Sequence, residues 1–373
     1  MQIFDHRNPF FPLSAARPCP NVMTSGNDHQ QPIKNTFMTT VLEDFERMMQ
    51  MLTASFVTQI AGAVATYSIA DHLAKGPATA KQIATIEGID SSATFRLLRA
   101  CASLGLVTSD DELTFSSTPL LGTLRASVPG SLHSLAIAWS APGHWLPWGR
   151  FSDAIRTGQP QTVPALGAAI WDYYAQQPEE AAAFTNAMHG LTSGVAMDVA
   201  RLVDTSRAKL AVDIGGASGT LVHSLMIANP QLHGIIFDLP DVVPSATAAA
   251  AGLGLAERSR VLAGDFFDSV PEADLYLLKN ILHDWDDGQG VRILENCRRA
   301  IRPGGRVIVI EMILGEMGKP GPAPFMDLNM MVMLPGRERT LSEYRALLKE
   351  ACFRIDKSSQ THSSMAVIEA VAA

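Results

Sequence analysis

Charge is scarce in this 373-residue chain, and positive charge is scarcer than negative charge. Charged residues make up 18%, and 29 lysines and arginines stand against 37 aspartates and glutamates, which gives a net charge of −8. Proteins that bind nucleic acids neutralise phosphates with basic patches, so this balance argues against a nucleic-acid partner. Hydrophobic residues account for 47%, which is enough to build large cores and excludes a disordered or fibrous chain.

Cysteine is also rare, and its four copies stand far apart, at Cys19, Cys101, Cys297 and Cys352. No two of them have the spacing of a zinc site or of a redox-active pair. Isolated cysteines are typical of proteins from a reducing compartment, so we expect a cytoplasmic protein.

Residues 1–37 lack the basic start and the continuous apolar run of a signal peptide, and we expect a flexible leader there. One uncharged run, residues 48–70, is long enough to imitate a membrane span. Its polar residues recur at helical spacing, at Ser55, Thr58, Gln59, Gly62 and Thr66. This stripe predicts a helix of a soluble protein whose broad apolar face packs on a partner, with no membrane contact.

Residues 38–125 predict short helices followed by a hairpin, which is a winged-helix layout. Ser91 is expected to cap the second helix of the motif, and Gly105 to end it. In a DNA-binding protein this helix would read bases, but Arg96 and Arg99 are surrounded by apolar residues and the wing is acidic at its tip. We therefore predict a mainly helical, winged-helix-like dimerisation domain.

Residues 126–189 are rich in aromatic side chains and are interrupted repeatedly by proline and glycine. The aromatic residues are Trp139, Trp145, Trp148, Phe151, Trp171, Tyr173, Tyr174 and Phe184. We expect a helical linker in which part of this set packs in a core. The rest, Trp148 among them, would contribute to a pocket for an aromatic ligand.

Residues 190–373 alternate between apolar strands and helices. The strands are predicted at 210–214, 234–238, 260–262, 273–279, 306–311 and 364–370. Helices between successive strands indicate a parallel sheet with right-handed crossovers. The pattern predicts a doubly wound, Rossmann-like α/β domain over 190–373.

Three strand ends in this domain carry residues suited to a nucleoside-containing ligand. The segment 212–219, Val-Asp-Ile-Gly-Gly-Ala-Ser-Gly, is a glycine-rich turn that lets the backbone approach a ligand closely. Asp238 ends the second strand, where a carboxylate can accept both ribose hydroxyls. Residues 264–267, Gly-Asp-Phe-Phe, offer an acid for an adenine amino group and a ring to pack on the base. A glycine loop alone is weak evidence, because dinucleotide enzymes share it.

With these motifs the chain resembles the S-adenosylmethionine-dependent O-methyltransferases, which include plant caffeate and flavonoid enzymes and bacterial natural-product tailoring enzymes. The resemblance runs from about Leu42 to the C-terminus. It rests on residues 212–219, 237–240, 264–267, 279–285, 304–306 and 336–340. The loop departs from the family at Ala217, where a third glycine is usual. A methyl group is tolerable there if φ is negative, with a slight weakening of cofactor binding.

The resemblance implies S-adenosylmethionine as cofactor, S-adenosylhomocysteine as its product, a homodimer and an aromatic or polyketide-like acceptor. It implies cofactor contacts from Gly215, Asp238, Asp265, Phe266 and Lys279. It implies His283 as general base, with Glu311 and Glu338 flanking and orienting it. It implies acceptor contacts from Phe184, Met188 and Met330.

The chemistry of methyl transfer suits these residue types. A phenol has a pKa of about 10 and histidine one of about 6.5, so complete proton transfer before methylation would cost about 5 kcal/mol. The proton therefore leaves as the methyl group arrives, or a carboxylate raises the pKa of the histidine. A glutamate beside the imidazole also fixes its tautomer.

Other interpretations remain open at this point. Some proteins that resemble this family bind the cofactor but catalyse a pericyclic or hydroxylation reaction, often after losing the base, whereas all three catalytic candidates are present here. A winged-helix regulator that senses the cofactor is a further hypothesis, against which the acidic charge argues. Methylation at nitrogen or carbon would use the same cofactor site. The acidic group Asp284, Asp286 and Asp287 suits solvated residues at a helix start better than magnesium, so we expect no metal.

Overall fold

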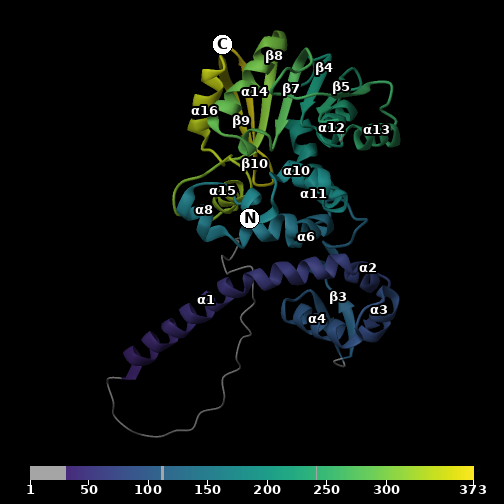
Figure 1. Cartoon of the computed structure of the whole chain (residues 1–373), viewed down its shortest axis with the longest axis vertical. Helices are drawn as coiled ribbons and strands as arrows, with labels where there is room; N and C mark the ends of the chain where they lie inside the picture. Colours follow the sequence, from purple (N-terminus) through teal and green to yellow (C-terminus); the bar gives the residue numbers. More distant parts are fainter. Residues whose placement is uncertain (1–30, 111–112, 241) are drawn as a thin grey trace. The chain divides into compact units, whose positions relative to one another are not determined.

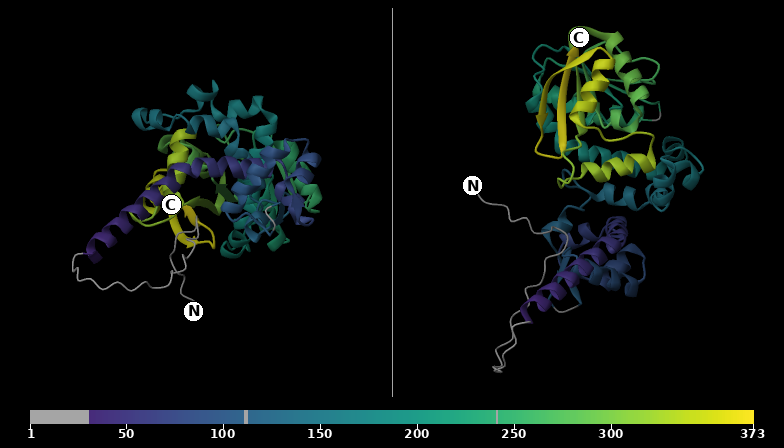
Figure 2. Two further views of the ribbon diagram at one scale, coloured as in Figure 1. Left: turned by 90° about the horizontal axis from the view of Figure 1, so that it is seen from below. Right: turned by 90° about the vertical axis from the view of Figure 1, so that its left-hand side faces the viewer.

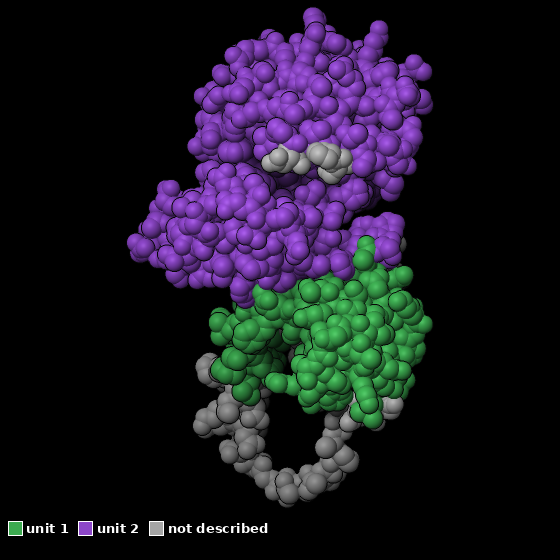
Figure 3. All heavy atoms as spheres, turned by 45° about the vertical axis from the view of Figure 1, so that its right-hand side comes forward, with its two compact units in different colours: residues 1–126 green, residues 127–373 purple. Residues whose placement is uncertain are grey.

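The computed structural model describes residues 31–110, 113–240 and 242–373, with the side chains of all of these except 31–41, 244 and 245. The chain divides into two compact units, residues 1–126 and residues 127–373, which Figure 3 draws in different colours. The segment 126–189, expected as a linker, therefore falls almost wholly within the second unit.

The described part of unit 1 is mainly helical, with one small antiparallel sheet. Its helices are α1 (Gln31–Thr66), α2 (Ile69–Ala74), α3 (Ala80–Glu87), α4 (Ser91–Ser103) and α5 (Pro119–Gly122). Its strands are β1 (Ala78–Thr79), β2 (Val107–Ser109) and β3 (Thr114–Ser117), in the order β1-β3-β2. Ile83, Leu98 and Phe115 are buried in its core. This succession of helices and hairpin is the winged-helix-like layout expected from the sequence.

Two local expectations in unit 1 were wrong. Residues 31–37 belong to α1 rather than to a flexible leader; Pro32 stands in the first turn, where its missing N–H costs nothing. The rest of the leader, residues 1–30, lies outside the described residues. The cap of α4 is Asp90, not Ser91, because the Asp90 carboxylate accepts the N–H of Ala93 at 2.7 Å. Gly105 follows α4 with a φ of +72°, as a helix-ending glycine should.

Helix α1 leaves large apolar side chains exposed. They are Leu42, Phe45, Met48, Met49, Met51, Leu52 and Phe56. Its segment Leu42–Thr66 is long and apolar enough to cross a membrane by length and composition, and 17% of its most apolar stretch is buried. The core helix of a soluble protein passes the same test, so this finding is weak evidence for a membrane. An uncovered apolar face of this size indicates that another surface packs on it.

Unit 2 combines a large sheet with many helices (Figure 1). Its strands are β4 (Leu210–Ile214), β5 (His233–Asp238), β6 (Ser259–Ala263), β7 (Ala273–Lys279), β8 (Ile301–Met312), β9 (Phe353–Gln360) and β10 (Met365–Ala372). Helices α6 (His133–Ser140), α7 (Pro142–Trp148), α8 (Phe151–Thr157), α9 (Thr162–Leu166), α10 (Ile170–Gln176) and α11 (Pro178–Leu202) precede the sheet. Between and after the strands come α12 (Thr220–Ala228), α13 (Val243–Gly252), α14 (Asp287–Ala300), α15 (Ala323–Met333) and α16 (Leu341–Glu350).

The strand order in the sheet is β6-β5-β4-β7-β8-β10-β9. Strands β4 to β8 run parallel, as the alternating pattern predicted, whereas β10 is antiparallel to both β8 and β9. The sheet is therefore mixed rather than wholly parallel. Strand β9 was not predicted, because it is an edge strand whose side chains beyond Phe353 are mostly exposed and polar.

Helices cover both faces of this sheet (Figures 1 and 2). On one face Val212 and Tyr276 pack with residues of α14 and α16. On the other, Leu275 and Ile308 pack with residues of α11, α12 and α13. Because side chains alternate along a strand, each buried strand supplies both layers, and the two clusters form the core of a doubly wound α/β domain.

The order of the strands brings the loops of a typical ligand crevice to one edge of the sheet. The parallel strands all end at the same edge, and β4 has β5 on one side and β7 on the other. In such sheets the loops after these strands diverge, and ligands bind between them. The described segments that leave this edge are 215–219, 239–240, 264–267, 280–286 and 313–322.

Candidate active site

The glycine-rich loop after β4 is tightly packed against its neighbours. Gly215 has a φ of +62°, and its N–H donates to the Phe237 carbonyl oxygen at 2.8 Å. A Cβ at Gly215 would lie 2.5 Å from Ile281 Cδ1, so a side chain there would have to displace Ile281 as well as adopt a positive φ. Gly219 is restricted in the same way, with a φ of +75° and Ile236 2.6 Å from a built Cβ. The loop therefore presents bare backbone to the crevice, which a close-fitting ligand needs.

Ala217 departs from what the sequence suggested. Its φ is +48°, in the left-handed region, so the condition that φ be negative is not met. The conformation is held by a hydrogen bond from the Ala217 N–H to Asp238 Oδ2 at 2.8 Å. A Cβ in this region is disfavoured by roughly 1–2 kcal/mol, so the loop is strained at this residue.

Asp238, at the end of β5, is held by backbone donors on both oxygens. Besides the bond from Ala217, its Oδ1 accepts the N–H of Leu239 at 2.7 Å. Burial raises the pKa of Asp238, and these two hydrogen bonds oppose the shift. The carboxylate is fixed at the crevice edge, in an orientation set by the glycine loop.

The segment after β6 combines an exposed acid with a cluster of aromatic rings that meet edge to face. Asp265 is exposed, and its Oδ1 accepts the N–H of Phe267 at 2.8 Å. Phe266 lies edge-on to Phe267 at 4.9 Å and to Trp285 at 6.1 Å between ring centroids. A built Cβ at Gly264 would lie 2.5 Å from the Phe237 ring. The glycine loop, the Asp238 carboxylate and the aromatic rings thus follow the neighbouring strands β4, β5 and β6. This arrangement fits a nucleoside-containing cofactor.

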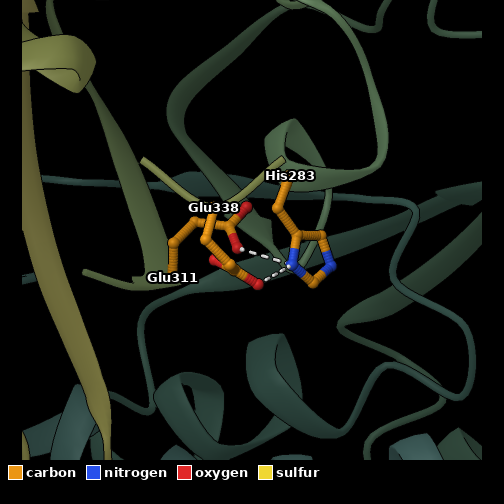
Figure 4. A group of neighbouring side chains, drawn as sticks. All are labelled: His283, Glu311 and Glu338. Atoms are coloured by element: carbon orange, nitrogen blue, oxygen red, sulfur yellow. Dashed lines mark hydrogen bonds and ion pairs between the residues drawn. The ribbon is translucent and has the colours of Figure 1, made fainter. Parts of the chain in front are cut away.

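His283, Glu311 and Glu338 come together beside this crevice (Figure 4). Glu311 is near the end of β8, and His283 lies in the short 3₁₀ turn η1 (Leu282–Asp284) after β7. His283 Nδ1 lies 2.8 Å from Glu338 Oε1 and 3.7 Å from Glu311 Oε2. All three side chains are buried. Both glutamates therefore face one ring nitrogen, and Nε2 is on the other side of the ring.

The charges around His283 set its protonation. Burial alone lowers the pKa of the imidazole, but the carboxylates of Glu311, Asp284 and Glu338 outweigh it and raise the pKa to about 10. Burial in turn raises the pKa of Glu311 to about 7, although the His283 charge opposes this. The site is thus a buried cluster in which several carboxylates surround the imidazole and influence one another's protonation.

Asp284 was expected to be a solvated acid at a helix start, and it is not. Its Oδ1 lies 3.3 Å from His283 Nε2, and its side chain is 14% exposed. Burial raises the pKa of Asp284 to about 6. Asp286 does cap a helix, accepting the N–H of Gln289 at 2.8 Å at the start of α14. Proximity to His283 in the chain was the signal that could have separated Asp284 from the other two.

Two further buried charged groups lie near the ends of the neighbouring strands β4 and β7. Burial lowers the pKa of Lys279 to about 8, against the opposing charges of Glu311, Asp213 and Asp284. Burial raises the pKa of Asp213 to about 7, although its Oδ2 accepts the N–H of Val222 at 3.2 Å. Asp213 belongs to the loop motif but was not singled out from the sequence.

Arg339 holds the η1 turn in place, a role that no sequence pattern indicated. The side chain is completely buried. Its guanidinium donates to the carbonyl oxygens of Leu282 at 2.7 Å and Trp285 at 2.8 Å, and pairs with Asp287 at 2.8 Å. A Cβ at Gly336 would collide with the backbone of η1, so this segment wraps closely around the turn. The run 336–340 thus serves both to supply Glu338 and to clamp the turn that carries the imidazole.

Of the four expected acceptor residues, two pack in one cluster and two do not. Trp148 and Phe184 pack on one buried cluster with Tyr174 and Val332. The Trp148 Nε1–H donates to Asn329 Oδ1 on α15 at 2.8 Å, so its polar end is satisfied within the protein. Phe184 stacks on Tyr174 at 5.1 Å between ring centroids. Met188, partly buried on α11, and Met330, buried on α15, do not belong to this cluster.

The described residues offer one group that could hold a metal ion, and it is the same triad. Ligand atoms of His283, Glu311 and Glu338 all lie within 4.8 Å of one another. The 2.8 Å contact between Nδ1 and Glu338 already has the geometry of a histidine oriented by a carboxylate. The absence of a metal requirement stays a prediction.

Comparison with known proteins gives two family matches in one chain. A model described as an O-methyltransferase domain matches residues 148–354, and one described as an O-methyltransferase dimerisation domain matches residues 47–124. The phenazine O-methyltransferase PhzM of Lysobacter antibioticus is 33% identical over 324 residues, covering 87% of this chain and 95% of the relative.

Solved structures agree with these matches. Human N-acetylserotonin methyltransferase, in complex with S-adenosylmethionine, has a TM-score of 0.81 at 28% identity, over 94% of this chain and 99% of that one. The O-methyltransferase NcsB1 of neocarzinostatin biosynthesis, in complex with S-adenosylmethionine and 2-hydroxy-5-methyl naphthoic acid, has a TM-score of 0.74 at 31% identity. The match spans 85% of this chain and 96% of the NcsB1 chain.

Proposed function

Because this chain belongs to the S-adenosylmethionine-dependent O-methyltransferases of the natural-product type, we propose that it methylates a hydroxyl of an aromatic or polyketide-like small molecule with His283 as general base. The observation that carries the proposal is the buried contact of His283 Nδ1 with Glu338, which orients the ring so that Nε2 faces away from both glutamates. The donor supplies a methyl group on a positively charged sulfur, and S-adenosylhomocysteine is the product.

The protein's own contribution is to orient the acceptor and to take its proton. Glu338 and Glu311 hold the Nδ1 side of the ring, so a neutral imidazole keeps its hydrogen there and its lone pair at Nε2. An acceptor hydroxyl at Nε2 would displace Asp284, which lies 3.3 Å from this atom. The proton then passes to Nε2 as the hydroxyl oxygen is methylated.

The raised pKa of His283 suits a phenolic acceptor. A base with a pKa of about 10 has nearly the same proton affinity as a phenol, so the transfer is close to isoenergetic. Against an unperturbed histidine the same transfer would cost about 5 kcal/mol. Of the two routes considered from the sequence, a histidine pKa raised by carboxylates is therefore the one that this proposal adopts. A complex of imidazolium and phenolate holds the same number of protons as a complex of neutral imidazole and phenol. The two forms differ only in which partner carries the proton.

The cofactor would lie along the ends of β4 to β7. We assign its methionine and ribose portions to Gly215 and Asp238, and its adenine to Asp265 and Phe266. Bare backbone at Gly215, the fixed carboxylate and the exposed acid beside a ring support these roles. Lys279, with its pKa lowered by burial, lies among acids and would balance their charge.

The remaining assignments follow the same family. We place the acceptor against Phe184, Met188, Met330 and Trp148, with the helices over 126–189 contributing the pocket. Residues 38–125 would form the dimerisation domain and 190–373 the catalytic domain of a cytoplasmic homodimer. The exposed face of α1 supports the dimer, because a second copy would cover it.

The test is methyl transfer from isotopically labelled S-adenosylmethionine to a panel of phenols, hydroxyquinones and amines, with the product mass and the methylated atom determined directly. One added methyl group on a hydroxyl of an aromatic acceptor is the expected result. Transfer only to amines would overturn the acceptor class. Tight cofactor binding with no transfer to the panel or to a crude metabolite extract would favour a non-methylating reaction instead.

A further inference from the structure

One histidine of helix α11 reaches across to the cofactor loop. His189 Nδ1 lies 2.6 Å from Thr220 Oγ1 and 3.1 Å from Ser218 Oγ. The two hydroxyls are 3.0 Å from each other, so the three groups form a closed hydrogen-bonded triangle. Helices α11 and α12 pack side by side in unit 2 (Figure 1), which keeps the imidazole within reach of the loop.

This contact joins two elements to which different ligands are assigned, the cofactor loop and helix α11 of the proposed acceptor site. Ser218 and Thr220 flank Gly219, the last residue of the glycine loop. Ser218 directly follows Ala217, whose N–H donates to Asp238. His189 follows Met188 directly on α11, and Phe184 lies on the same helix. Both of these are proposed acceptor contacts. The hydrogen bonds of His189 are therefore the polar link between the helix facing the acceptor and the loop facing the cofactor.

We propose that His189 is a positioning residue that couples the cofactor loop to α11, so that cofactor binding orders the acceptor side of the site. This rests on the proposed function, in which the loop binds S-adenosylmethionine and α11 lines the acceptor pocket. By linkage, a loop conformation favoured by the cofactor stabilises the attached helix position, and an ordered α11 in turn favours cofactor binding. His189 touches neither reacting atom, so its role is separate from that of His283.

The geometry of the contact gives a sharp set of variants. Asparagine places a polar atom close to the position of histidine Nδ1, so His189→Asn keeps an acceptor for Thr220, whereas His189→Ala removes it. His189 is exposed, so neither change leaves a buried polar group behind. Ser193→Ala is the matched control, because the Ser193 hydroxyl, one turn along α11, bonds only to the carbonyl oxygen of His189 within the helix.

The first measurement is the dissociation constant of S-adenosylhomocysteine by calorimetry. His189→Ala is expected to weaken binding by about three- to tenfold, the range for one hydrogen bond, and to lower the melting temperature by no more than about 4 °C. His189→Asn should recover most of the loss, and Ser193→Ala should bind like the wild type. The changes His189→Ala and Thr220→Val should be non-additive, since each removes the same contact. Additive effects, or equal losses in the asparagine and alanine variants, would overturn the coupling.

The second measurement asks whether the signal reaches the acceptor helix. Hydrogen exchange is followed in peptides covering residues 184–192, with and without S-adenosylhomocysteine. We expect cofactor-dependent protection in the wild type and in Ser193→Ala, and its loss in His189→Ala. Protection that persists in His189→Ala while cofactor still binds would refute the coupling and leave the methyltransferase assignment intact. Failure of the wild type to bind S-adenosylhomocysteine would refute both.

Discussion

Helix α1 exposes apolar side chains to solvent, whereas the edge of the large sheet buries charged ones. Along α1, apolar residues such as Phe45, Leu52 and Phe56 are exposed. At the sheet edge, charged residues such as Glu311, Glu338 and Arg339 are buried. Each arrangement is unfavourable unless something compensates for it.

The compensation differs between the two regions. The buried charges find ionic partners within one chain, because His283 pairs with Glu338 and Arg339 donates to backbone oxygens. Only Oε2 of each glutamate lacks a hydrogen-bond partner among these described groups. The described chain offers no comparable cover for the exposed face of α1. The charged cluster thus finds its ion-pair partners in a single copy, whereas the first unit leaves an apolar face that a partner surface would cover. Perturbing each region separately tests this contrast.

The largest effect is expected from the base itself. His283→Ala should lower kcat by about 10²- to 10⁴-fold, the usual contribution of a general base. Initial rates of transfer to the acceptor found in the panel provide the measurement. His233→Ala is the matched control, because His233 is exposed and begins β5, at the opposite end of the strand from the site. Calorimetry with S-adenosylhomocysteine confirms that the variant is folded. Turnover within a few-fold of the wild type would refute the base assignment.

The next effect concerns assembly. We expect a dimer at micromolar concentration, and Phe56→Asp should weaken it by about thirty-fold or more, as an aromatic anchor lost from an interface does. Light scattering over a dilution series measures the change. Ser55→Asp adds the same charge at the neighbouring exposed position, on the polar stripe, and should leave the dimer largely intact. A wild-type monomer, or equal effects of the two substitutions, would mean that α1 is covered in another way.

A smaller effect distinguishes the roles of the carboxylates. Because the pKa of His283 is raised to about 10, its neutral form becomes more abundant as pH rises, and kcat/KM should rise with pH below that value. Glu338→Gln removes one cause of the raised pKa, so the acid limb should move to lower pH, by about one unit, while the maximum rate falls. Glu316→Gln, on an exposed residue, is the control. An acid limb that stays in place would show that Glu338 does not set the protonation of the base.

The contrast also explains what could be predicted from the sequence. The strands β4 to β8 and the residues that follow them came from local signals, namely apolar runs and short motifs such as the glycine loop. The roles of Arg339 and His189 depend on partners distant in the chain, Leu282 and Thr220, which no local pattern indicates. Strand β9 escaped notice because an edge strand buries few side chains.

The smallest effect tests the strained loop. Ala217→Gly should relieve a left-handed alanine at the cost of glycine's extra freedom when unfolded, for a net stabilisation of about 0.5–1 kcal/mol. Chemical denaturation followed by fluorescence measures the change. Ala248→Gly, at an exposed position within α13, makes the same substitution in right-handed helix and should destabilise by a similar amount. Since the two sites differ in the sign of φ, opposite shifts are expected, and shifts in the same direction would contradict strain at Ala217.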